Sequence, residues 1–157
     1  MTTLVIDTGQ SIIGVYSVED QQYVAYRGSR IAEGVERVRL ADVVVTYNGE
    51  RRDLWDIARW AGIDDEDWPL QGEHIDMQVK VWEPIVGSSL IRTYDRHFTD
   101  CPECPFSDAD SETIDGYELS NRCDVYMTLK LWELWKADKL RLMGYGYLHH
   151  GNHGWTP

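Results

Sequence analysis

Three aspartates lie at the borders of apolar segments that are far apart in the sequence. Asp7 ends the first apolar run, Asp53 follows the valine-rich run at 43–47, and Asp124 lies inside an amphipathic segment, at the border of its apolar face. A carboxylate in such a place needs a partner, because an isolated buried charge is very costly. Carboxylate oxygens are the ligands that Mg²⁺ and Mn²⁺ prefer. We therefore predict that Asp7, Asp53 and Asp124 share a divalent metal ion.

Each of these aspartates also has a simpler interpretation. Asp7 can be an ordinary loop residue, Asp53 the N-cap of a helix, and Asp124 a solvated residue on a helix surface. The order of the surrounding elements, together with Asn48 at the end of the valine-rich run, favours the shared site.

The hydrophobic pattern predicts the elements that would bring these residues together. Short β-rich runs predict strands at 3–9, 11–19, 21–28 and 42–48, with a further possible strand at 73–82. Helical spacing of apolar residues predicts helices at 30–41, 52–63, 88–98 and 118–143. The segment 99–116 is acidic and contains Pro and Ser, which predicts an exposed loop. This order predicts an α/β fold with a mixed central sheet, an antiparallel meander followed by parallel strands, flanked by helices.

Composition limits the possible partners. The chain has 157 residues, of which 43% are hydrophobic, and its formal net charge is −12. We predict one domain at 1–140 and a Gly- and His-rich tail at 141–157. The negative charge opposes a broad nucleic-acid-binding surface, but it allows a small site where metal ions supply positive charge. With no apolar run long enough to span a bilayer and no signal sequence, we expect a soluble cytoplasmic protein without a membrane partner.

The cysteines raise the possibility of a second metal. Three cysteines argue against a disulfide framework. His97, Cys101 and Cys104 have the spacing of a zinc knuckle, and Cys123 is a candidate fourth ligand. Free thiols in a loop are the alternative to this structural Zn²⁺.

Taken together, the motifs resemble the DEDD 3′–5′ exonucleases of the RNase H-like superfamily, especially the proofreading domains of phage and family-B DNA polymerases. "VIDTG" takes the place of the first motif, normally Asp-x-Glu, and "YNGERRD" resembles the second, Asn-x4-Asp, through Asn48 and Asp53. Asp76 matches the acid of the Ile-Asp strand that commonly follows, and "SSLIRTYDRHF" resembles the Ser-Leu helix beyond it. "NRCDVYMTLKLWELW" resembles the third motif around Asp124. The resemblance covers residues 3–136.

This resemblance implies an RNase H-like fold and two-metal hydrolysis of phosphodiester bonds at single-stranded DNA or RNA ends. It makes Asp7, Asp53 and Asp124 the catalytic, metal-binding residues and Asn48 a substrate-binding residue. Arg51 and Arg52 are candidates for phosphate contacts, with plain solvation as the alternative. The nearby aromatics Tyr47, Trp55 and Trp60 are candidates for stacking on bases, but the helical spacing of the two tryptophans favours packing in the core.

Two departures from the family pattern predict a weakened enzyme. Gly9 stands where the family has a metal-binding glutamate. Leu119 and Ser120 stand where the family has a water-orienting His or Tyr. The alternative is a catalytically inactive exonuclease-like module that binds a host protein with a basic surface, such as a phage-encoded inhibitor of a nucleic-acid enzyme.

Overall fold

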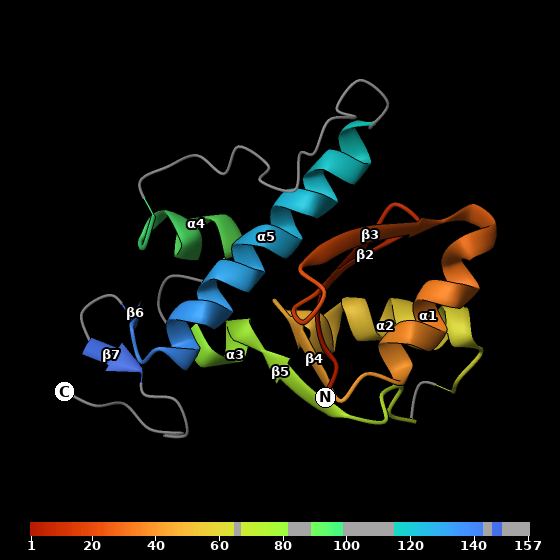
Figure 1. Ribbon diagram of the computed structural model, residues 1–157, viewed down its shortest axis with the longest axis horizontal. Coiled ribbons are helices and arrows are strands. Elements are labelled where there is room, and N and C mark those ends of the chain that lie inside the picture. Colours follow the sequence, from red (N-terminus) through yellow and green to blue (C-terminus); the bar gives the residue numbers. More distant parts are fainter. Residues whose placement is uncertain (65–66, 82–88, 99–114, 143–145, 149–157) are drawn as a thin grey trace.

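The computed structural model describes residues 1–64, 67–81, 89–98, 115–142 and 146–148, and its centre is a five-stranded mixed sheet (Figure 1). The strand order is β3-β2-β1-β4-β5. The strands are β1 (Thr3–Gly9), β2 (Ile12–Ser17), β3 (Gln22–Arg27), β4 (Val43–Thr46) and β5 (Glu73–Asp76). Strands β1, β2 and β3 form an antiparallel meander, whereas β4 and β5 run parallel to β1. This confirms the predicted α/β fold, and the arrangement is compatible with an RNase H-like fold.

Helices cover both faces of the sheet. They are α1 (Ile31–Arg39), α2 (Asp53–Ala61), α3 (Met77–Val81), α4 (Leu90–Asp95) and α5 (Gly116–Lys136). Helices α1 and α2 pack on one face, and the long helix α5 crosses the other, with α4 beside it (Figure 1). Within the described ranges, no helix is both long and apolar enough to cross a membrane.

Strand β1 separates two apolar cores by simple alternation of its side chains. Leu4 and Ile6 pack with α1 and α2, whereas Val5 packs with α5. Because side chains of a strand alternate between faces, Asp7 lies on the α5 face and Thr8 on the α2 face. This alternation decides the partners of both residues in the site.

Two predicted elements end earlier than expected. The predicted strand at 73–82 stops at Asp76, whose carboxylate accepts the backbone N–H of Gln78 at 2.9 Å, and α3 begins. The predicted helix at 118–143 stops at Lys136, because Asp138 adopts a left-handed φ of 54°. The Lys139 N–H then donates to the Leu134 carbonyl at 2.8 Å, a closure that normally uses glycine.

A second, two-stranded sheet follows α5, formed by β6 (Leu140–Leu142) and β7 (Gly146–Leu148). The predicted boundary between domain and tail at 140 therefore falls inside β6, and the division into 1–140 and 141–157 stays a prediction. The predicted loop at 99–116 lies outside the described residues up to 114, and α5 begins at Gly116.

Candidate active site

The carboxyl ends of β1, β4 and β5 meet at one edge of the sheet, where α5 passes over β1 and leaves a pocket of about 560 Å³. Parallel strands place the residues at their ends along a shared edge, which is where α/β sheets commonly bind ligands. Asp7, Asp53 and Asp124 all line this pocket, so the structure brings the three predicted acids together. The two positions that depart from the exonuclease pattern, Gly9 and Ser120, line it as well.

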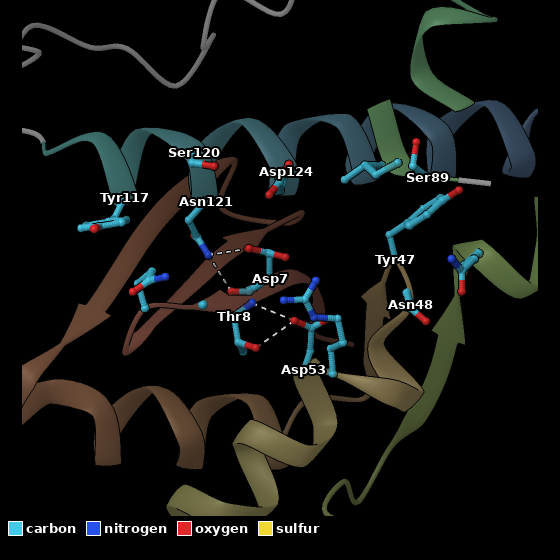
Figure 2. A pocket seen from close by; sticks show the side chains of 15 residues that line it. Asp7, Thr8, Tyr47, Asn48, Asp53, Ser89, Tyr117, Ser120, Asn121 and Asp124 are labelled. Carbon is cyan, nitrogen blue, oxygen red and sulfur yellow. Dashed lines mark hydrogen bonds between the residues drawn. The ribbon is translucent and has the colours of Figure 1, made fainter. Parts of the chain in front are cut away.

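Asp7 projects from β1 toward α5 and is half-buried (Figure 2). Its Oδ2 accepts a hydrogen bond from Asn121 Nδ2 at 2.7 Å. Burial, followed by the negative charges of Asp53 and Asp124, raises the pKa of Asp7 well above its usual range. The positive charge of Arg52 and the hydrogen bond from Asn121 act in the opposite direction on this pKa. Burial and the neighbouring carboxylates thus disfavour the ionised form of Asp7.

Asp53 begins α2, but its carboxylate does not cap that helix. It is buried, and its Oδ1 accepts hydrogen bonds from the backbone N–H of Thr8 at 2.8 Å and from the Thr8 hydroxyl at 2.9 Å. Burial raises the pKa of Asp53 to about 6 against these hydrogen bonds, which lower it. Of the two interpretations of Asp53, the structure favours a residue directed into the site over an N-cap.

Asp124 extends from α5 into the space that Asp7 faces, and it is half-buried (Figure 2). No residue in the described part of the chain donates a hydrogen bond to its carboxylate. Burial raises the pKa of Asp124, and Arg52 lowers it. Asp124 therefore offers both of its oxygens to a ligand of the pocket.

The donor atoms suit a hard divalent cation. They are carboxylate oxygens, and in Asp7 and Asp124 at least one of these oxygens accepts no hydrogen bond from the described residues. In the described residues, however, no three His, Cys, Asp or Glu side chains form a group that could hold a metal ion. Magnesium commonly binds through one or two carboxylates and completes its shell with water and substrate phosphate. The pocket fits that mode better than an all-protein cage of three carboxylates. A shared Mg²⁺ or Mn²⁺ stays a prediction.

The predicted zinc site cannot be placed. Cys101 and Cys104 lie outside the described residues, and Cys123 is a half-buried cysteine on α5. The His97 ring Nδ1 lies 2.8 Å from the Thr93 carbonyl, one helical turn earlier. Zinc therefore stays a prediction.

The predicted substrate-binding residues do not all line the same pocket. Asn48 and Arg52 line the main pocket, whereas Arg51 is exposed and lines a neighbouring hollow with Asp76. Asn48 has a left-handed φ of 65°, and its N–H donates to Asp76 Oδ1 at 2.8 Å. Asp76 thus acts as an anchor for the turn between β4 and α2, and it does not line the main pocket.

Several residues of the pocket were not expected from the sequence. Thr8 and Asn121 hold two of the three acids, and Leu90 and Tyr117 add apolar and aromatic surface at the rim beside Tyr47, which was expected near the site. A signal for Asn121 was present, because a residue three positions before Asp124 lies on the same side of a helix. The prediction that Trp55 packs in the core was wrong, since this side chain is 64% exposed. Trp60, also on α2, is half-buried and packs against the core.

Neither a protein-family profile nor a curated protein sequence matches this chain. Among solved structures it is similar to the family B DNA polymerase from the hyperthermophilic archaeon Pyrobaculum calidifontis, with a TM-score of 0.53 and 17% sequence identity. The match covers 85% of this chain and 24% of the polymerase chain. At that identity the likeness concerns the fold, and the chain spans about a quarter of the polymerase's length.

Proposed function

We propose that this chain is a metal-dependent phosphodiesterase of the 3′–5′ exonuclease type, acting slowly on single-stranded nucleic-acid ends. The observation that carries the proposal is the convergence of Asp7, Asp53 and Asp124, from three distant parts of the chain, on one pocket at the carboxyl edge of the sheet. The motifs that resemble polymerase proofreading domains and the fold likeness to a family B DNA polymerase support the same class independently.

The residues around the acids suit the end of a single strand. Arg52 is an exposed cation at the pocket and can pair with a phosphate, while Asn48 offers polar atoms beside it. Tyr117 is 59% exposed at the rim and Tyr47 is half-buried, with its hydroxyl 2.8 Å from Thr93 Oγ1. Aromatic side chains of this kind stack on bases without sequence preference. A small basic contact and two aromatic faces match a short strand end better than a long duplex.

The carboxylates have distinct tasks in this proposal. Asp7 and Asp124 would hold a divalent ion through their available oxygens, and Asp53, whose Oδ1 accepts from Thr8, would contact the water shell of that ion through its other oxygen. When bound, such an ion would supply Lewis-acid chemistry, polarising the phosphate and making a water molecule a better nucleophile. Ser120 has no group that titrates near neutral pH, so the side chain at this position cannot serve as a general base. The reaction is therefore expected to be slow.

The test is degradation of a 5′-labelled single-stranded oligonucleotide in the presence of Mn²⁺. A ladder of products shortened from the 3′ end is expected, and Asp7→Asn or Asp124→Asn should abolish it. Asp56→Asn is the matched control, because Asp56 lies one turn along α2 and does not line the pocket. Loss of activity is expected to be at least about 100-fold for the pocket variants. Activity equal in parent and Asp7→Asn protein would identify a contaminant and refute the proposal.

A second candidate is a non-catalytic module that binds a basic protein surface. The absence of a three-carboxylate metal group in the described residues and the net charge of −12 favour it. In that case, no nucleotide release occurs with Mg²⁺ or Mn²⁺, and a basic protein co-purifies in stoichiometric amount with parent and Asp7→Asn protein alike. Nuclease activity that depends on Asp7 would reject this candidate.

A further inference from the structure

Asn121 is one of the most thoroughly bonded side chains at the pocket. It lies on α5, one turn before Asp124, and is only 4% exposed. Its Nδ2 donates to the Asp7 carbonyl at 2.9 Å and to Asp7 Oδ2 at 2.7 Å, and its Oδ1 accepts from the Tyr23 hydroxyl at 2.8 Å. A single amide thereby joins α5 to β1 and β3, across 114 and 98 residues of the sequence.

The chemistry of these partners fixes the direction of the amide. Both atoms of Asp7 that face Asn121 are acceptors when the carboxylate is ionised, so the amide must present its two N–H groups to Asp7. The Oδ1 then points to Tyr23, whose hydroxyl can donate to it. A flipped amide would place its oxygen against two other oxygens. Asn121 therefore recognises both the position and the charge of Asp7.

The backbone of Gly14 lies directly against this amide. Gly14 pairs with Asp7 across β1 and β2. A Cβ atom at Gly14 would lie 1.6 Å from Asn121 Oδ1 and 2.8 Å from the Tyr23 hydroxyl. Glycine at this position is thus a steric requirement of the Asn121 and Tyr23 contact.

We propose that Asn121 is a positioning residue that holds Asp7 with one carboxylate oxygen bonded and the other turned to the pocket, with Tyr23 and Gly14 keeping the amide in place. This inference rests on the proposed function of the pocket and adds a residue to it. A residue that orients a metal-binding side chain commonly changes metal affinity by about 10- to 100-fold when removed. The role differs from that of Asp124, because Asn121 acts on the cation only through Asp7.

The test compares Mn²⁺ affinity, followed by electron paramagnetic resonance, in Asn121→Ala, Tyr23→Phe and Val125→Ala proteins. Val125 is the control, because it is fully buried on the same helix and does not line the pocket. We expect Asn121→Ala to bind Mn²⁺ about 10- to 100-fold more weakly, Tyr23→Phe to be weakened less, and Val125→Ala to bind as the parent does. Parent-like affinity in folded Asn121→Ala protein, or an equal loss in Val125→Ala protein, would overturn the inference.

A crystal structure of the Asn121→Ala protein separates failure of this inference from failure of the proposed function. The Asp7 carboxylate should leave its parent orientation, whether or not the pocket binds a metal. If the parent protein binds no Mn²⁺, the proposed function fails, while the orientation of Asp7 in the variant still decides on Asn121. An unchanged Asp7 side chain would show that its own packing is sufficient, and Asn121 would then have no positioning role.

Discussion

Replacing Asp53 with asparagine should make the protein more stable near pH 8 while it destroys the activity. Burial raises the pKa of Asp53 from its ordinary 3.8 to about 6. Because the folded-state pKa is the higher one, the favourable contribution of the protonated group is complete below about pH 4 and is lost as the pH rises through about 6. A shift of this size means that the ionised Asp53 lowers the unfolding free energy by about 3 kcal/mol at about pH 8.

Asparagine removes the charge and keeps an oxygen for the two hydrogen bonds from Thr8. We expect Asp53→Asn to raise the unfolding free energy at about pH 8 by between about 1 and 3 kcal/mol, since the new N–H₂ group lacks an assigned acceptor. The gain should shrink as the pH falls toward about 4, where the parent carboxylate is protonated. Urea unfolding at several pH values, followed by tryptophan fluorescence, measures both effects.

Asp56→Asn is the matched control for this substitution. Asp56 Oδ2 also lies 2.9 Å from the Thr8 hydroxyl, but the residue is half-buried and forms a 2.7 Å ion pair with Arg59. Its replacement should cost at most about 1 kcal/mol, because exposed ion pairs contribute little. If Asp53→Asn lowers stability at about pH 8 by more than the control does, the Asp53 charge stabilises the fold, and the reasoning from burial is refuted.

Three further substitutions test other parts of the site. Arg52→Gln should bind Mn²⁺ roughly fivefold more tightly and an oligonucleotide more weakly, because a cation beside the acids opposes metal but attracts phosphate; both affinities changing in the same direction would contradict this. Gly14→Ala should lower the unfolding free energy, measured in urea, by about 1–3 kcal/mol, because a Cβ at this position collides with Asn121. An unchanged urea midpoint would contradict the close contact between Gly14 and Asn121. Gly9→Glu combined with Ser120→Tyr should increase nuclease activity about 10²-fold or more, because both positions line the pocket. A Cβ atom at Gly9 has space, since no atom beyond its chain neighbours lies within 4 Å of it. A folded double variant that binds Mn²⁺ and releases no nucleotide would support the non-catalytic candidate.

The sheet could be predicted from the sequence because local pattern and burial agree in it. Runs such as that around Val44 are apolar since both faces of the strand are covered, and Gly62 ends α2 with a left-handed φ of 67°, as its residue type suggests. The early end of α5 was missed because an aspartate, Asp138, takes the left-handed conformation there. The predicted strand before α3 was too long because the Asp76 carboxylate that accepts the Gln78 N–H is also bonded to a turn 26–28 residues away, a contact that the local sequence does not reveal.

The three acids of the pocket, with Asn48 and Arg52, could be predicted from the sequence, whereas the residues that hold the acids in place could not. Asp7 and Asp124 could be inferred from carboxylates at the borders of apolar segments, together with a family resemblance. The contact between Asn121 and Asp7 spans 114 residues and leaves no periodic trace in the sequence. Trp55 has the spacing of a core residue, but its position on α2 leaves it exposed, because burial depends on which face the sheet covers.

The most direct test of the central claim is an anomalous-difference map from crystals of the protein with Mn²⁺ and a short single-stranded oligonucleotide. The account predicts a Mn²⁺ peak between Asp7 and Asp124, at about 2.0–2.2 Å from at least one oxygen of each, with the terminal phosphate beside Arg52. It also predicts that the peak disappears in Asp7→Asn crystals. Oligonucleotide bound in the pocket without a peak at these carboxylates, or a peak that persists in Asp7→Asn crystals, would contradict the account.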